Sequence, residues 1–456
     1  MESRTEGSGG ESKRAHGVPG WAEPVSRRSV LKGIGLGAAA LGSGGFLQAC
    51  SNSIKGSGSS STGKLTVGFV TPQTGALAGF ASGDNFVVET IRKTDAYKNG
   101  FKVGGKTYTV DIVVKDSQSD PNRASEVTSD LILQNHADIV VTSSTPETTN
   151  PVATVCETQG VPCVSTVVPW QAWYFARQKD PANPQPFKFT TMYFFGAEAF
   201  GGCFIPMWDR IPTNKVVAGQ WPNDPDGSAF RAAWPGMAKA AGYTIVDGGA
   251  YADGTTDYTS MISKFKSKDC EIFTNAPLPP DFNTFWKQAA QQGFKPKLAT
   301  VAKVLLFPAD TDALGSLVNN IATDSWWGPF MPYASSLSGE TASALAAGYT
   351  SSTGKQWVQS IGSTYALFEV AKEAFTAASN PHDKAEVAGA LHNVNYTGMC
   401  GAINFAGGPA PGVGIIPPIG VQWKKATGKF PFEMQVVDNS LNKDVKITAD
   451  LHPTNA

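Results

Sequence analysis

The residues of this 456-residue chain that are best suited to chemistry include a run of hydroxyl side chains, Ser143, Ser144 and Thr145. The run lies between an apolar stretch and a segment with helical character that begins near Thr148. Hydroxyl groups next to the free N–H groups of a helix N-terminus can bind a carboxylate or an amide oxygen. Capping of the helix explains each single hydroxyl equally well. The run therefore predicts a site for a small polar group, with helix capping as the alternative.

Acidic residues also occur in predicted turns. They are Asp116, Asp120, Asp224 and Asp226. Such carboxylates could act as acid and base or bind Ca²⁺, but carboxylates in turns commonly cap or face solvent. The spacings H-E-x-x-H and G-x-S-x-G do not occur, and the chain has five histidines. We therefore expect no enzyme, no metal and no cofactor, and a hydrolase is the least favoured alternative.

The elements that position these residues follow an alternating pattern. Short β-branched runs alternate with longer amphipathic ones, which is typical of a parallel sheet covered by helices. The pattern restarts after an aromatic segment near residue 170, which predicts a second doubly wound lobe. In open α/β sheets, ligands bind beyond the carboxyl ends of the strands. The candidate loops are residues 71–75, 117–120, 142–149 and 165–170 in the first lobe and 221–227, 275–279 and 300–303 in the second.

Five segments of the chain, in order, are KLTVGFVTPQTGALAGF, VVKDSQSDPNRASEVTSDLI, ADIVVTSSTPETTNPVATVCETQGVPCVS, TTDYTSMISKFKSKDCEIFTNAPLPPDFNTFWKQAAQQGFKPK and GAINFAGGP with GVQW. Together they resemble the type I solute-binding proteins of ABC importers, in the branch that binds branched-chain amino acids. The resemblance implies two Rossmann-like lobes joined by three crossing strands. It also implies that a small solute binds in the cleft and that a membrane permease receives the closed form.

The resemblance and the alternation together suggest a domain plan. We expect lobe 1 at residues 64–188, lobe 2 at 189–325, a return to lobe 1 at 326–412, and a third crossing with a return to lobe 2 and a tail at 413–456. The candidate ligand-binding residues are Ser143, Ser144, Thr145, Ser165, Thr166, Trp170, Tyr193, Trp221, Asp226, Asn275 and Lys303.

Three positions depart from the family pattern. Pro169 stands where the family has a carboxylate-binding Thr, and Asp226 stands where it has a Tyr that stacks on the ligand. The acid that would bind an α-ammonium falls near Lys303, and residues 298–307 contain no acid. A buried ammonium without a paired acid is costly. We therefore expect a small neutral or anionic solute, such as an amide or a carboxylate, ahead of a free amino acid.

Two details of this expectation remain open. The apolar part of the solute is expected against Trp170 and Trp221, although such aromatic residues often serve only as packing. In the alternative, Lys303 points to solvent and Asp224 or Asp226 binds the ammonium of an amino acid. A ligand-sensing lipoprotein of the same fold is the alternative to an importer component.

The first 63 residues resemble an export segment. The stretch SRRSVLK, with Arg27 and Arg28, is similar to a twin-arginine signal, and LQAC, ending at Cys50, is similar to a lipobox. We expect a signal peptide at residues 1–49 and a lipidated Cys50 with a Gly/Ser-rich tether at 50–63. This predicts a monomer anchored by lipid to the outer face of the cytoplasmic membrane. A buried Ala/Gly helix with an incidental cysteine is the alternative.

The cysteines and the net charge bear on which disulfide can form and on which partners the chain can bind. Five cysteines follow Cys50, and Cys156 and Cys163 are close enough in the sequence for a local disulfide, with free thiols as the alternative. The 37 Lys and Arg residues nearly balance the 38 Asp and Glu residues. A near-neutral chain gives no electrostatic reason to bind nucleic acid.

Overall fold

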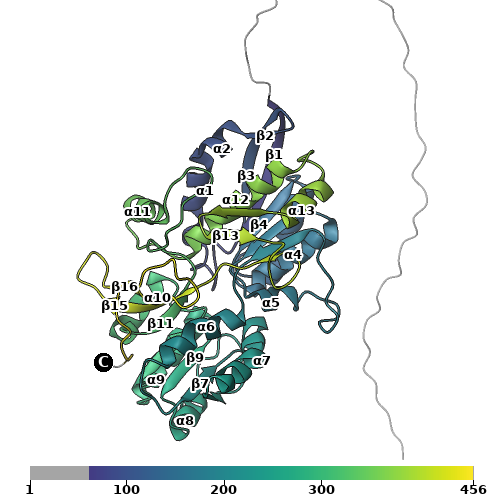
Figure 1. Cartoon of the computed structure of the whole chain (residues 1–456). Helices are drawn as coiled ribbons and strands as arrows, with labels where there is room; N and C mark the ends of the chain where they lie inside the picture. Colours follow the sequence, from purple (N-terminus) through teal and green to yellow (C-terminus); the bar gives the residue numbers. More distant parts are fainter. Residues whose placement is uncertain (1–60, 455–456) are drawn as a thin grey trace, which may run out of the picture. The chain divides into compact units, whose positions relative to one another are not determined.

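The computed structural model describes residues 61–454. They build one compact unit of two α/β lobes (Figure 1). The expected export signal with Arg27 and Arg28, the expected lipidation site Cys50 and nearly all of the tether lie outside the described residues. In the described part of the chain, none of the helices combines the length and the apolar composition that crossing a bilayer requires.

The first lobe is built on a seven-stranded sheet whose strands are parallel except for one at the edge. The order across the sheet is β14 (Val413–Gly414), β6 (Thr190–Tyr193), β5 (Cys163–Thr166), β4 (Ile139–Ser143), β1 (Ser61–Thr71), β3 (Lys106–Asp116) and the antiparallel β2 (Phe101–Val103). Every residue of β4 is buried, as expected for a β-branched run in the middle of a sheet covered on both faces.

Helices cover this sheet. They are α1 (Asp84–Lys93), α2 (Asp95–Asn99), α3 (Pro121–Leu133), α4 (Pro146–Gln159), α5 (Trp170–Tyr174), α11 (Ala342–Thr353), α12 (Ser360–Ala377) and α13 (Lys384–His392). Local signals in the sequence explain their starts. Asp120 caps α3 by accepting a hydrogen bond from the N–H of Arg123 at 2.7 Å, and Pro121 occupies the first turn. A short hairpin of β12 (Asn395–Gly398) and β13 (Gly401–Asn404) follows α13.

The second lobe has a mixed sheet of seven strands. The order is β16 (Phe432–Asp438), β15 (Ile419–Lys425), β11 (Ala322–Ser325), β10 (Leu298–Val301), β9 (Ile272–Asn275), β7 (Val216–Gln220) and β8 (Thr244–Asp247). Strands β7 to β11 are parallel, whereas β15 and β16 form an antiparallel extension. The other elements of this lobe are α6 (Ala197–Trp208), α7 (Pro225–Ala240), α8 (Thr259–Ser267), α9 (Pro279–Gln291), α10 (Pro308–Leu314) and a 3₁₀ turn (Gly315–Val318).

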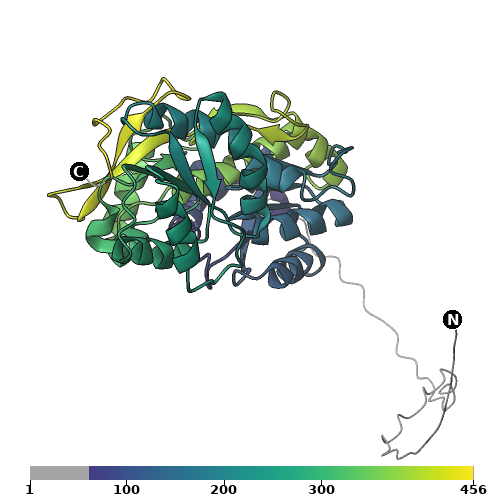
Figure 2. The ribbon, with the colours of Figure 1, turned by 90° about the horizontal axis from the view of Figure 1, so that it is seen from below.

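The chain passes between the two sheets three times: after β6, after β11 and after β14. In Figure 2 the yellow strands β15 and β16 lie at the end of the body opposite the blue helices of the first lobe. The two-lobed doubly wound fold predicted from the sequence is therefore confirmed. The expected start of lobe 2 at residue 189 was too early, because β6 pairs with β5 in the first sheet.

Cys156 and Cys163 are both buried free thiols, so the local disulfide considered from the sequence is not formed. Cys156 lies on α4 and Cys163 on β5, and burial raises the pKa of the Cys156 thiol, which also hydrogen-bonds Cys163. The pair therefore packs as part of the core of the first lobe.

Candidate ligand-binding site

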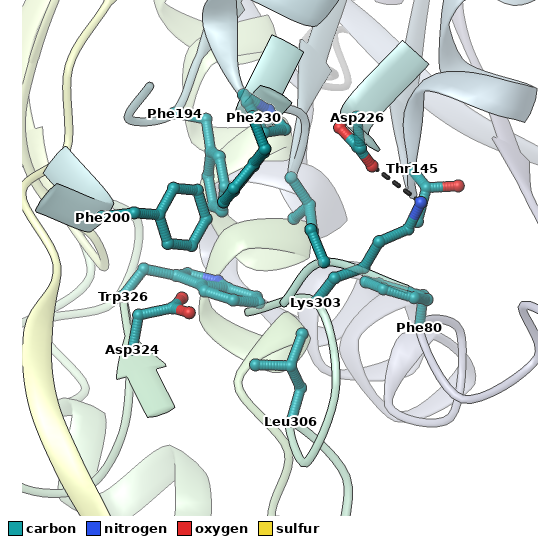
Figure 3. A pocket seen from close by; sticks show the side chains of 13 residues that line it. Phe80, Thr145, Phe194, Phe200, Asp226, Phe230, Lys303, Leu306, Asp324 and Trp326 are labelled. Atoms are coloured by element: carbon teal, nitrogen blue, oxygen red, sulfur yellow. Dashed lines mark ion pairs between the residues drawn. The ribbon is translucent and has the colours of Figure 1, made fainter. Parts of the chain in front are cut away.

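The strand-end loops of the two lobes meet around a small cavity of about 30 Å³ (Figure 3). Its lining is mostly apolar, with four polar residues. The lining residues are Phe80, Val167, Pro169, Phe194, Phe200, Phe230, Ala276, Leu306 and Trp326, with the polar Thr145, Asp226, Lys303 and Asp324. The lining residues of the first lobe lie in the segments that follow β1, β4, β5 and β6. Those of the second lobe lie in α6, in α7, at the end of β11 and in the loops after β9, β10 and β11. This is the edge at which doubly wound sheets bind ligands.

The most prominent polar feature is a buried ion cluster around Lys303. Its Nζ lies 2.7 Å from Oδ2 of Asp226, 3.2 Å from Oδ2 of Asp224 and 3.1 Å from Oε1 of Glu147. Asp224 and Asp226 belong to the second lobe with Lys303, whereas Glu147 lies in the first turn of α4 in the first lobe. The ammonium of Lys303 therefore joins the two lobes. The three carboxylates are close enough to hold a metal ion, but the ammonium already lies among them.

Helix starts place the carboxylates of this cluster. Asp224 caps α7 by accepting a hydrogen bond from the N–H of Gly227 at 2.6 Å, and Asp226 lies in the first turn. Glu147 has the equivalent place in α4, after Pro146. Carboxylates are favoured at these positions because the N-terminus of a helix carries partial positive charge.

The loop after β10 places Lys303 with a backbone that few residues adopt. Lys303 has φ of 66° and Leu305 has φ of 55°, in the left-handed region that costs non-glycine residues about 1–3 kcal/mol. The Oδ1 atom of Asn275 supports the start of this loop by accepting a hydrogen bond from the N–H of Ala302 at 3.1 Å. Strain of this kind persists where the surroundings fix the conformation, and here the ion cluster contributes to that constraint.

Burial and charge set the protonation of the cluster. Burial lowers the pKa of Lys303, but the nearby carboxylates of Asp226, Glu147 and Asp224 outweigh it and raise the pKa well above its ordinary value. Burial raises the pKa of Glu147, but Lys303 and hydrogen bonds outweigh it, so that this pKa lies below its ordinary value. For Asp226 burial dominates and, despite Lys303, raises the pKa to about 7. Lys303 and Glu147 are therefore charged at neutral pH, and Asp226 titrates near it.

Aromatic rings form much of the remaining wall. Phe194 and Trp326 pack edge to face with ring centroids 5.0 Å apart, and Phe200 and Phe230 lie 4.7 Å apart. Asp324 is next to Trp326 in Figure 3 and is 1% exposed. Burial raises the pKa of this carboxyl to about 7, and its Oδ1 has no hydrogen-bond partner among the described residues.

Three of the candidate residues chosen from the sequence line the cavity: Thr145, Asp226 and Lys303. Lys303 is buried among carboxylates from α4 and the start of α7, so the alternative in which it points to solvent is wrong. Ser143 and Ser144 lie buried next to Thr145, and both of their Oγ atoms are without a hydrogen-bond partner in residues 61–454.

The other candidates from the first lobe do not line the cavity. Ser165 is buried in β5, and Thr166 donates a hydrogen bond to the backbone carbonyl of Tyr193 at 2.7 Å. Tyr193 is buried and donates to the carbonyl of Ser363 in α12. Trp170 donates its indole N–H to Glu198 at 2.8 Å, next to the first crossing. These contacts support the strands and the crossing behind the cavity.

Two candidates from the second lobe also lie outside the lining. Trp221 is completely buried, and its ring packs so closely over Gly219 that a Cβ there would lie 2.6 Å from the ring. Asn275 pairs with Gln220 across β7 and β9 and supports the loop of Lys303. The apolar walls expected from Trp170 and Trp221 are instead formed by Phe194, Trp326 and other rings.

Several lining residues were not among the candidates: Phe80, Phe194, Phe200, Phe230, Leu306, Asp324 and Trp326. Asp324 carried a usable signal, because a single acid follows the short segment NIAT and precedes the paired tryptophans Trp326 and Trp327. Phe200 and Phe230 carried none, since a phenylalanine on an amphipathic helix normally packs in the core.

Replacing Lys303 by methionine should destabilise the protein in a pH-dependent way. At pH 8 we expect the free energy of unfolding to fall by about 3–5 kcal/mol, since buried carboxylates lose their counter-charge. Carboxyls whose pKa is raised on folding favour the folded state at low pH, and this stability is lost as pH rises through the raised pKa. The loss should therefore shrink at pH 5, where Asp226, with its pKa of about 7, is protonated.

Urea unfolding followed by circular dichroism at both pH values checks this prediction. Lys287→Met, at an exposed position of α9, is the matched control and should change little. Adding Asp226→Asn to Lys303→Met should restore part of the stability. Lys303→Met could instead lower the free energy of unfolding equally at pH 5 and pH 8, or Asp226→Asn could restore no stability. Either result would show that the charges of the cluster are not the source of the lost stability.

Comparison with known proteins identifies solved structures with a similar fold. Among solved structures, a leucine-binding protein LivK from Thermotoga maritima is 16% identical, with a TM-score of 0.65 over 86% of this chain and 100% of that one. The substrate-binding protein LivJ from Streptococcus pneumoniae, in complex with isoleucine, is 18% identical, with a TM-score of 0.64 over 86% and 99% of the two chains.

A third similar structure is an ABC-transporter solute-binding protein from Rhodopseudomonas palustris in complex with 3,4-dihydroxybenzoic acid. It is 16% identical, with a TM-score of 0.63 over 84% of this chain and 98% of that one. At these identities the likeness concerns the fold. The sequence model of the family described as periplasmic binding protein matches residues 64–414, which is most of the chain. This chain therefore belongs to the periplasmic binding protein family.

Proposed function

We propose that this chain is the extracytoplasmic substrate-binding protein of an ABC importer and that it encloses a small organic solute in the interlobe cavity. The observation that carries the proposal is the composition of the cavity wall, to which both lobes contribute strand-end residues. The isoleucine and the dihydroxybenzoic acid bound by two proteins of similar fold support a small solute with an apolar portion.

The contacts between the lobes suggest how the solute is held. Helices α4 and α5 of the first lobe contact α7 of the second, and the Glu147–Lys303 ion pair lies at the same junction. For a solute to reach the cavity these contacts must separate, with the three crossings as the hinge. Hinge closure of this kind is typical of two-lobed binding proteins. A permease in the membrane would then receive the closed, loaded form.

The sequence predicts several chemical classes of solute. Amino-acid-like compounds, amides and small carboxylates were the candidates from the sequence. The preference for a neutral or anionic solute rested on the lack of an acid for the ammonium of an amino acid and on repulsion of that ammonium by Lys303. Because three carboxylates surround the ammonium of Lys303, it offers little uncompensated positive charge to an anion. The electrostatic preference must therefore come from other groups of the cavity.

Binding of a solute should both stabilise and compact the protein. At a hundredfold excess over its Kd, a ligand stabilises the folded state by about 2.7 kcal/mol. We expect one class from a panel of amino acids, carboxylates, amides and amines to raise Tm and to reduce the radius of gyration in small-angle X-ray scattering. Ala276→Phe, which fills the cavity, should abolish both effects, whereas Ala344→Phe on the exposed face of α11 should retain them. A panel that changes neither quantity contradicts the proposed function.

We further propose that residues 1–49 direct export and that Cys50 carries a lipid. The support is the sequence alone, with Arg27 and Arg28 in SRRSVLK and Cys50 at the end of LQAC. Changing both arginines to lysine should leave precursor in the cytoplasm, and Cys50→Ala should release the body from membranes. Cell fractionation with immunoblotting checks both. Normal export of the double-lysine variant would rule out the twin-arginine route.

A further inference from the structure

The interlobe cavity contains a second acid that the Lys303 cluster does not explain. We propose that Asp324 and the aromatic rings near it bind the positively charged nitrogen of the solute, so that the cavity takes an organic ammonium ion with an apolar body. This inference rests on the proposed function and adds the chemical class of the solute.

Asp324 lies in β11, whose backbone pairs with β10 on one side and β15 on the other, so its position is fixed by the sheet. Its carboxyl is 1% exposed, and its Oδ1 has no hydrogen-bond partner among the described residues. Among residues 61–454, no lysine, arginine or histidine forms an ion pair with it. An acceptor left unsatisfied in a buried site carries the full cost of its desolvation. A partner for Oδ1 is therefore missing among the described residues.

Another buried acid of this protein, Asp84, has hydrogen-bond partners for its carboxyl within the fold. Asp84 is also 1% exposed, but both of its oxygens accept hydrogen bonds, one from the hydroxyl of Thr71 and the other from that of Thr364 at 2.9 Å. Asp324 has no such hydroxyl next to its Oδ1, and it lines the cavity. Burial alone therefore does not account for an acid at this position.

The rings near Asp324 suit a cation. Trp326 lies two residues further along the chain, and Phe194 packs edge to face against it with centroids 5.0 Å apart. Phe200 and Phe230 complete this part of the wall. In Figure 3 Asp324 lies beside Trp326, on the side of the cavity away from the Lys303–Asp226 pair. The faces of aromatic rings attract ammonium groups, most strongly those of tryptophan.

The charges of the cavity favour an ammonium ion over the other solute classes. Lys303 is matched by Asp226, Asp224 and Glu147, so the cluster carries no surplus positive charge for a carboxylate. An anion near the rings would be repelled by Asp324. A neutral solute would leave the carboxyl of Asp324 without a charged partner. The remaining lining, including Leu306, Val167 and Phe80, is apolar and favours an apolar body.

Matched solutes test the inference directly. Isobutyl, benzyl and 2-phenylethyl compounds are compared, each as the amine, the alcohol and the carboxylate with the same body. By isothermal titration calorimetry at pH 7.5, the best amine should bind at least about 10-fold more tightly than its alcohol and its carboxylate. Asp324→Asn should weaken the binding of that amine about 10- to 100-fold, the loss expected for a charge-assisted hydrogen bond.

The control removes a charge from a buried carboxyl at the amino end of β4, outside the cavity lining. Asp138→Asn, directly before β4, should leave the affinity for the amine unchanged. If Asp324→Asn does not fold, the order of affinities measured with the unaltered protein still decides. Phe230→Leu then provides a second test and should weaken binding of the amine more than binding of the alcohol.

The possible failures are distinguishable. If carboxylates or alcohols bind as tightly as the amine, or if Asp324→Asn leaves binding of the amine unchanged, the ammonium site is wrong while a solute-binding function stands. If none of these compounds binds, and the broader panel of amino acids and amides also fails, both proposals fall. Preferential binding of the amine that depends on Asp324 supports both.

Discussion

The ammonium of Lys303 is the interaction on which the geometry of the cavity depends. It binds carboxylates from both lobes, and its removal would leave buried carboxylates without a counter-charge. Helix N-termini hold the three carboxylates, and a left-handed backbone conformation holds the lysine. The position of α4 relative to α7 is therefore tied to this ammonium.

In the proposed function, the groups that hold the lobes together differ from the groups that select the solute. Because carboxylates already surround the ammonium of Lys303, the main effect of the cluster is to bring the loop after β10 against α4. In the proposed function, selection then involves cavity groups without an internal partner, among them Oδ1 of Asp324 and the faces of Phe194, Phe200, Phe230 and Trp326.

The parallel pattern of strands was enough to predict the fold and the edge at which the cavity lies. Thr145 and Lys303 could be chosen from the sequence because each directly follows a strand that points to this edge. The partners of Lys303 could not be foreseen, since Glu147 is 156 positions away in the chain and lies in the other lobe. Trp221 was misjudged because an indole at a strand end can fold back over a glycine, as it does over Gly219.

The most direct test of this account is a crystal structure of the protein with the solute from the panel that binds most tightly. The account predicts that the solute lies in the cavity between the lobes, with its nitrogen at hydrogen-bonding distance from Asp324 and with Lys303 still bound to Glu147. A solute bound outside the cavity, or a loaded form in which Lys303 and Glu147 have separated, would contradict it.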